Sequence, residues 1–153
     1  MPANPNAPLA GIKVIDLTHA YAGPFSTFHL ATMGADVLKI EAPGGDEFRD
    51  WRELTFAQAN AGKRSMVLNL KQPEGLEVLD RLVAGADVLV ENSRPGALEK
   101  MGIAWERLKA INPRLIFCSI SGYGQTGELR GRPAMEWSVQ AMSGINRIYV
   151  NED

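Results

Sequence analysis

The chain has 153 residues and 45% hydrophobic residues, which is enough for one domain with a substantial core. Its formal net charge of -2 provides no basic field, which argues against nucleic acid as a partner. No apolar run is long enough for a membrane span, and one cysteine with two scattered histidines gives neither an intrachain disulfide nor a metal-binding spacing.

The first ten residues, MPANPNAPLA, are rich in Pro and Asn and predict a flexible lead. They lack the basic flank and apolar core of a signal peptide, so a cytoplasmic protein is expected.

The next thirty residues predict a β-α-β unit. Residues 11–17, GIKVIDL, form an apolar strand pattern, Pro24 suits the first turn of a helix that reaches about Met33, and residues 35–41, ADVLKIE, predict the second strand. Such tight connections favour parallel strands with a right-handed crossover. Residues 46–62 mix aromatic and charged side chains and predict a short helix or loop over one sheet edge.

The rest of the chain continues the alternation of strands and helices. The pattern predicts strands at 66–70, 87–91, 115–119 and from 145 to the end, helices at 73–83, 97–101, 105–111 and 136–142, and a glycine-rich loop at 121–127. The order predicts an α/β fold, with a Rossmann-like, mostly parallel sheet and helices on both faces.

The stretch 86–96, ADVLVENSRPG, predicts the buried strand around which the site is organised. Its apolar part gives way to Glu91, Asn92, Ser93 and Arg94 before a helix begins. Ligands of open α/β sheets bind at such strand ends. An amide, a hydroxyl and a guanidinium placed together suit a ligand that carries phosphate.

Other polar residues have structural as well as functional interpretations. His19 is expected to be a loop histidine bonded to backbone rather than a general base, because no orienting partner can be named. Lys63 and Arg64 suit either a solvated turn or a phosphate clamp. The glycine-rich loop 121–127 matches neither a dinucleotide fingerprint nor a P-loop, and suits a flexible connection or a ligand loop equally.

Cys118 is expected in the core. Solvated or gatekeeping roles are expected for the carboxylates that flank strands: Asp16, Glu41, Asp87 and Glu91.

Six segments of the sequence, in their order along the chain, resemble those of a known family. They are PLAGIKVIDLTHAYAGPFST, MGADVLKIEAPGGD, NAGKRSMVLNLKQPEG, ADVLVENSRPGALEKMGI, NPRLIFCSISGYGQTG and QAMSG. Together they resemble the family III CoA-transferases (the CaiB/BaiF family), which include formyl-CoA and carnitine CoA-transferases and the α-methylacyl-CoA racemases. The resemblance covers the chain after Pro8. It implies a Rossmann-like large domain that binds coenzyme A, a smaller second domain, and two interlocked subunits forming a homodimer.

The resemblance also implies a set of contacts with coenzyme A. They are His19, Ala20, Tyr21, Ala22, Leu68, Asn69, Leu70, Lys71, Asn92, Ser93, Arg94 and Lys100. Arg94 and Lys100 are expected at the phosphates of the 3′-phospho-ADP part, and Leu68 and Leu70 at the adenine. Ala42 stands where some relatives carry an arginine near the adenine, so that contact is expected to be absent.

The chemistry that the resemblance implies is transfer of coenzyme A between an acyl-CoA and a carboxylic acid, without a metal. An aspartate attacks the acyl-CoA thioester to form a mixed anhydride, and the released thiolate then converts it to an aspartyl-CoA thioester. In the family this aspartate follows the QAMSG segment, and it is expected beyond Asp153. No catalytic residue is therefore assigned here, and the chain alone is expected to be inactive.

Two alternatives stay open: an acyl-CoA racemase or epimerase, and a non-catalytic truncated fragment. Racemases carry a histidine just before an acidic residue, where this chain has Met135 and Glu136, and this difference favours transfer. Glu136 suits either the wall of an acyl pocket or a helix N-terminal carboxylate. The expected organisation is a flexible lead at 1–10 and an incomplete CoA-binding domain at 11–153, with the second domain absent.

Overall fold

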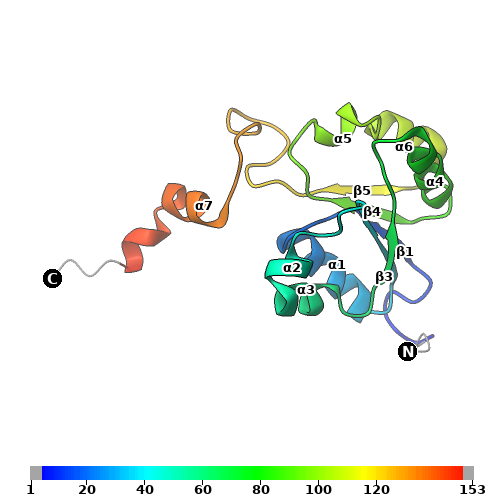
Figure 1. Cartoon of the computed structure of the whole chain (residues 1–153), viewed down its shortest axis with the longest axis horizontal. Helices are drawn as coiled ribbons and strands as arrows, with labels where there is room; N and C mark the ends of the chain where they lie inside the picture. Colours follow the sequence, from blue (N-terminus) through cyan, green and yellow to red (C-terminus); the bar gives the residue numbers. More distant parts are fainter. Residues whose placement is uncertain (1–4, 150–153) are drawn as a thin grey trace.

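The structure is a computed structural model that describes residues 5–149, and its centre is a parallel sheet covered by helices (Figure 1). The strands are β1 (Lys13–Asp16), β2 (Asp36–Glu41), β3 (Arg64–Val67), β4 (Val88–Glu91) and β5 (Ile116–Ser119). The helices are α1 (Ala22–Thr32), α2 (Phe48–Trp51), α3 (Glu53–Asn60), α4 (Pro73–Val83), α5 (Ala97–Lys100), α6 (Trp105–Ile111), α7 (Glu136–Ser143) and the 3-10 helix η1 (Ile145–Tyr149).

The five strands lie in the order β3-β2-β1-β4-β5, and every neighbouring pair is parallel. Val14 in β1 lies opposite Val37 of β2 on one side and Val88 of β4 on the other. The chain therefore winds outward from β1 to β3 and then crosses back to β4. Loops diverge where this winding reverses, so the crevice of a Rossmann-like sheet opens at the carboxyl ends of β1 and β4.

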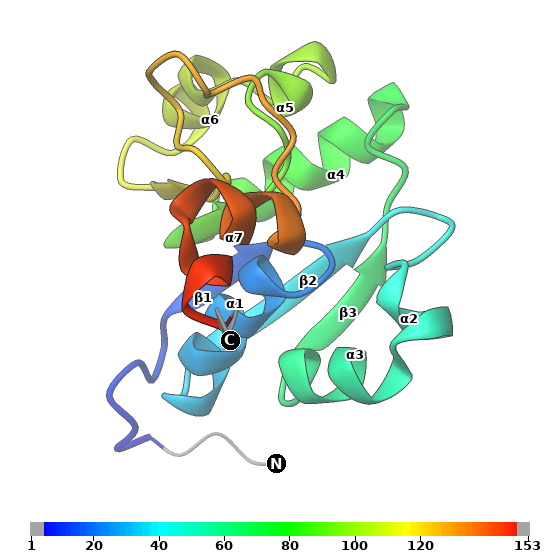
Figure 2. The same ribbon diagram turned by 90° about the vertical axis from the view of Figure 1, so that its left-hand side faces the viewer.

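Helices cover both faces of the sheet, as the sequence pattern predicts (Figures 1 and 2). The face under α4, α5 and α6 holds the larger core cluster, in which Leu79 and Val83 of α4 are fully buried beside Leu89 of β4. Helix α4 begins with Pro73, as expected for a residue that lacks an N–H. The opposite face holds a smaller cluster around Val37 and Val90.

Two predicted elements differ in position from those observed. Strand β3 begins at Arg64 because its register pairs Arg64 with Leu38, so Leu68 lies beyond the strand rather than within it. The segment 46–62 forms two helices, and α3 packs against α1 instead of capping an edge as a single short element.

Cys118 is exposed, so its expected place in the core is wrong. Strand β5 lies at the edge of the sheet, and Ile116, two residues earlier on the same face, is exposed as well. An apolar strand pattern predicts burial only where another layer covers that face of the strand.

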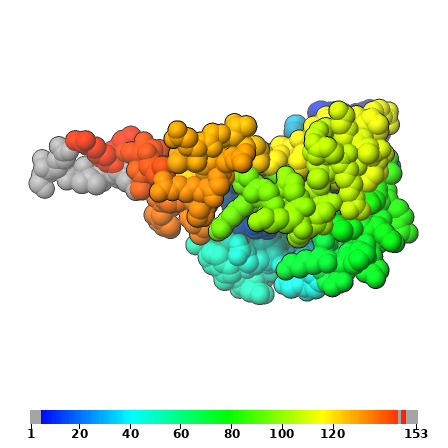
Figure 3. Space-filling model, turned by 90° about the horizontal axis from the view of Figure 1, so that it is seen from above, coloured from blue at the N-terminus to red at the C-terminus, as the bar shows by residue number. Residues whose placement is uncertain are grey.

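Helix α7 and η1 extend away from the sheet, as Figures 1 and 3 show in orange and red. The final predicted strand is wrong over Ile145–Tyr149, which is a 3-10 helix, and its last residues, 150–153, lie outside the described residues. A strand requires a partner for its backbone groups, and α7 leads the chain away from the sheet edges.

Candidate functional site

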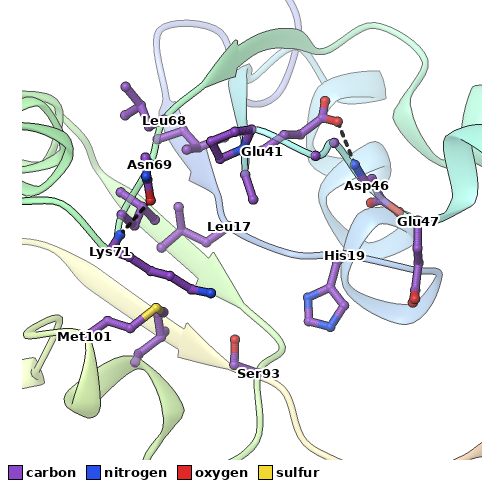
Figure 4. Close-up of a pocket in the computed structure, with 17 residues that line it drawn as sticks. Leu17, His19, Glu41, Asp46, Glu47, Leu68, Asn69, Lys71, Ser93 and Met101 are labelled. Atoms are coloured by element: carbon purple, nitrogen blue, oxygen red, sulfur yellow. Dashed lines mark hydrogen bonds between the residues drawn. The ribbon is translucent and has the colours of Figure 1, made fainter.

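A cavity of about 610 Å³ opens at the carboxyl ends of the strands, beside the point where the strand order reverses (Figure 4). Its walls come from the loops after β1, β2, β3 and β4 and from α5. Leu17, Leu68 and Met101 give it apolar surface, while Lys71 and Ser93 give it polar groups. A volume of this size suits a small organic ligand or part of a larger one.

The structure brings part of the expected set of contacts into this cavity. The expected residues that line it are His19, Leu68, Asn69, Leu70, Lys71 and Ser93. Ala42 also lines it, at the position where some relatives are expected to carry an arginine. Arg94 instead lines a neighbouring cavity of about 350 Å³ together with Glu91, Ser119 and Gln125. The remaining expected contacts line neither of these two cavities: Ala20, Tyr21, Ala22, Asn92 and Lys100.

The segment after β3 presents its side chains to the cavity through a tight turn. The N–H of Lys71 donates to Oδ1 of Asn69 at 3.2 Å, and the N–H of Gln72 donates to the carbonyl of Asn69 at 3.0 Å. Helix α4 begins immediately afterwards, at Pro73. The side chain of Lys71 then reaches across the cavity toward the loop that carries Ser93 (Figure 4), which places a cation beside apolar surface.

The loop after β1 is held by Asn92, and the imidazole of His19 points into the cavity (Figure 4). The N–H of His19 donates to Oδ1 of Asn92 at 2.9 Å, and Nδ2 of Asn92 donates to the carbonyl of His19 at 2.8 Å. The backbone of His19, rather than its ring, therefore makes the bonds that position this residue.

A buried lysine, which sequence reasoning missed, supports the cavity wall. Lys39 is 1% exposed, and its Nζ donates to the carbonyl of Thr18 at 2.8 Å and to Asp46 Oδ2 at 3.0 Å. These bonds join β2 to the loop after β1 and to the loop that begins α2. The available signal was a lysine within the buried strand pattern ADVLKIE, since a buried cation requires a partner.

Glu41 is buried at the rim of the cavity, so its expected solvated role is wrong. Arg49 donates to both of its carboxylate oxygens at 2.7 Å, Ser65 donates at 2.8 Å, and the N–H of Asp46 donates at 3.0 Å. These bonds, chiefly those from Arg49, lower the pKa of Glu41 from 4.5 to about 2, against the opposing effect of burial. The carboxylate is therefore held ionised, as a structural anchor between β2, β3 and α2.

Lys63 is part of a second buried ion pair. Its Nζ lies 2.9 Å from Asp16 Oδ2, and the lysine side chain is 1% exposed. Burial lowers the pKa of Lys63, although the charge of Asp16 opposes that change. Lys63 is neither part of a solvated turn nor a phosphate clamp, because its buried ammonium group is bonded to Asp16. Arg64 instead makes an exposed pair with Asp36 at 2.7 Å.

The carboxylates at the strand ends are structural acceptors. Asp16 also accepts from the hydroxyls of Thr18 and Thr27, and buried Glu91 accepts from the N–H of Ser93 at 2.6 Å and from the hydroxyl of Ser119. In the described part of the chain every buried polar side-chain atom has a hydrogen-bond partner. The carboxylate of Asp87, half-buried, accepts from the N–H of Lys13 at 2.8 Å.

Glu136 lies in the first turn of α7, accepts a bond from Gln140 at 2.6 Å and lines neither of the two cavities.

Over residues 5–149, no cluster of three or more side chains capable of binding a metal is found. No helix within the same residues has the length and apolar character needed to cross a bilayer.

Comparison with known proteins shows the family to which the chain belongs. Residues 9–153 match the family described as CoA-transferase family III, and the chain belongs to that family. It is 48% identical to an acetyl-CoA:oxalate CoA-transferase of Acetobacter aceti, over 94% of this chain and 39% of that protein. It is 42% identical to a succinyl-CoA:glutarate CoA-transferase of Mus musculus, over 95% of this chain and 35% of that protein.

Solved structures show the same fold. A CAIB/BAIF family protein from Brucella suis superimposes with a TM-score of 0.86 at 43% identity, over 92% of this chain and 40% of that one. The chain thus spans about two fifths or less of the length of these relatives.

Proposed function

We propose that this chain binds coenzyme A for a CoA-transferase that moves coenzyme A between carboxylic acids. The observation that supports the proposal is the 610 Å³ cavity at the strand ends, which combines the cation of Lys71 with the apolar side chains of Leu68 and Leu70. A cation suits a phosphate group, and leucine side chains suit the face of an adenine ring. The named relatives act on acyl-CoA and dicarboxylic acids, and we extend that substrate class to this chain.

In this proposal the nucleophile is an aspartate outside the 153 residues, which forms the aspartyl-CoA thioester. The residues of this chain bind and orient the coenzyme. Met135, where racemases of the family carry a histidine, supports transfer rather than exchange of an α-proton. A homodimer in the cytoplasm belongs to the same proposal.

The test is calorimetric titration of the chain with free coenzyme A. We expect saturable binding, and Lys71→Ala should weaken it roughly tenfold by removing a charge-assisted bond to phosphate. Lys109→Ala removes an exposed lysine from α6, outside both cavities, and is the matched control that should leave the affinity unchanged. Absence of binding in a folded sample, or equal effects of the two variants, would overturn the proposal.

Arg94→Ala extends the same titration to the second cavity. A weakened affinity would indicate that the phosphate part of coenzyme A reaches Arg94, as the family resemblance implies. An unchanged affinity would confine the ligand to the cavity that Lys71 lines.

A further inference from the structure

Asn92 makes two hydrogen bonds to a single residue across the crevice. Its amide accepts the N–H of His19 at 2.9 Å and donates to the carbonyl of the same residue at 2.8 Å. A primary amide carries an acceptor and a donor side by side, as this pair of bonds requires. The side chain of Asn92 therefore bonds to His19 as a neighbouring strand would, although β1 has ended at Asp16 and β4 at Glu91.

The backbone next to this contact is in an unfavourable conformation. Ala20 has a φ of +63°, and it is the one residue other than glycine with a positive φ in the described part of the chain. Such a conformation persists where surrounding bonds hold it. The two bonds with Asn92 hold the residue immediately before Ala20, and together with the bond from Lys39 to the carbonyl of Thr18 they fix the path of the loop after β1.

Close packing behind the amide keeps it in place. A Cβ atom added to Gly23 would lie 3.0 Å from Cγ of Asn92 and 2.4 Å from Cβ of Thr18. Helix α1 thus approaches the two loops as closely as a glycine permits. This contact leaves the amide of Asn92 little freedom to turn toward a ligand.

From these contacts we infer that Asn92 is a positioning residue that holds His19 at the cavity. His19 lines the cavity and Asn92 does not, and the imidazole points into the open space (Figure 4). The inference rests on the proposed function, since the ligand that His19 meets is coenzyme A. It assigns recognition of the ligand at this corner to the ring of His19, and the position of the backbone that carries this ring to Asn92.

A double-mutant cycle measured by titration with coenzyme A tests the inference. Asn92→Ala should weaken binding roughly fivefold to tenfold in the otherwise unchanged chain, because the backbone that carries the imidazole loses its fixed position. In a His19→Ala background the same change should weaken binding less than twofold, because no ring is left to misplace. Amide hydrogen exchange gives a readout without ligand, and the N–H of His19 should exchange faster in Asn92→Ala.

The outcomes separate the inference from the proposed function. Equal losses from Asn92→Ala in both backgrounds, or no loss in either, would overturn the positioning role while leaving coenzyme A binding intact. A folded unchanged chain that does not bind coenzyme A would overturn the proposed function, and the positioning role would fall with it. Should Asn92→Ala fail to fold, Asn92→Asp keeps the shape and the acceptor, loses the donor and is expected to show the same dependence on His19.

Discussion

At the scale of single residues, buried charges hold the loops that form the cavity. Glu41 accepts from Arg49, Ser65 and the backbone of Asp46, and Lys39 bonds to Asp46 from the other side. Removing one partner of such a pair leaves an uncompensated buried charge, which destabilises a protein more than the intact pair stabilises it.

The pKa of Glu41 leads to a prediction for stability against pH. The folded value is about 2 and the ordinary value 4.5, so the ionised form stabilises the fold fully above about pH 4.5. That contribution is lost as the pH falls from 4.5 toward 2. Glu41→Gln should lower the free energy of unfolding by roughly 2–3 kcal/mol at pH 7 and by much less near pH 2.

Denaturant unfolding of both proteins at a series of pH values measures this difference. Glu128→Gln, in the exposed segment before α7, is the control and should change stability little at any pH. A difference between Glu41→Gln and the unchanged chain that stays constant from pH 7 to pH 2 would contradict the role given to this carboxylate.

Single residues also show what the sequence could indicate about the site. Lys71 and Ser93 follow strand patterns directly, so their place in the cavity was predictable from topology together with the family resemblance. The pairing of Lys63 with Asp16 was not predictable, because it joins residues 47 positions apart. Two basic residues before a strand do not indicate which acidic residue they will pair with. The separation of Arg94 from the first cavity depends on the path of the loop 92–96, which no periodicity describes.

At the scale of elements, helix α4 is positioned by a glycine. A Cβ atom on Gly75 would lie 2.2 Å from the carbonyl oxygen of Asn69. The first turn of α4 therefore packs directly on the backbone that presents Asn69 and Lys71 to the cavity. The helix can come this close to the turn because Gly75 has no side chain.

Gly75→Ala should force α4 and the turn apart. We expect a loss of about 1–3 kcal/mol in the free energy of unfolding and a weaker affinity for coenzyme A, because Lys71 moves with the turn. Gly85→Ala is the matched control, since the nearest atom to its added Cβ would be 4.0 Å away. Equal stability of the two variants in thermal unfolding would show that the turn moves aside without cost.

The elements also mark the limits of prediction from periodicity. Helix α4 was predictable because its apolar side chains recur at helical spacing after Pro73. The predicted position of strand β3 was too late in the sequence. Residues 66–70 alternate like a strand, but β3 pairs with β2 from Arg64 onward. The local pattern of apolar residues does not determine which residues of two distant strands pair with each other.

At the scale of the whole molecule, apolar side chains are exposed where α7 and η1 leave the sheet. Trp137 in α7 is 76% exposed and Ile148 in η1 is 80% exposed, and Met135, just before α7, is exposed as well. Exposed apolar patches of this kind promote association. The isolated chain should therefore self-associate in a concentration-dependent way, as measured by sedimentation velocity.

Substitution tests whether this segment is responsible. A chain with Trp137→Gln and Ile148→Gln should stay monomeric to higher concentration than the unchanged chain. Leu54→Gln removes an equally exposed apolar residue from α3, and it should not have that effect. A chain that sediments as a clean monomer at every concentration would contradict the prediction.

The strand order has a consequence for how the chain folds while it is being synthesised. Of the five strands β1 is made first, yet it needs β4 on its second side, and Val14 can meet Val88 only after all of the intervening residues have been translated. Pairings between such distant segments form slowly. The nascent chain therefore carries β1 with one side open until β4 has been translated, and the N–H of Leu17, just after β1, cannot donate to the carbonyl of Val90 before then.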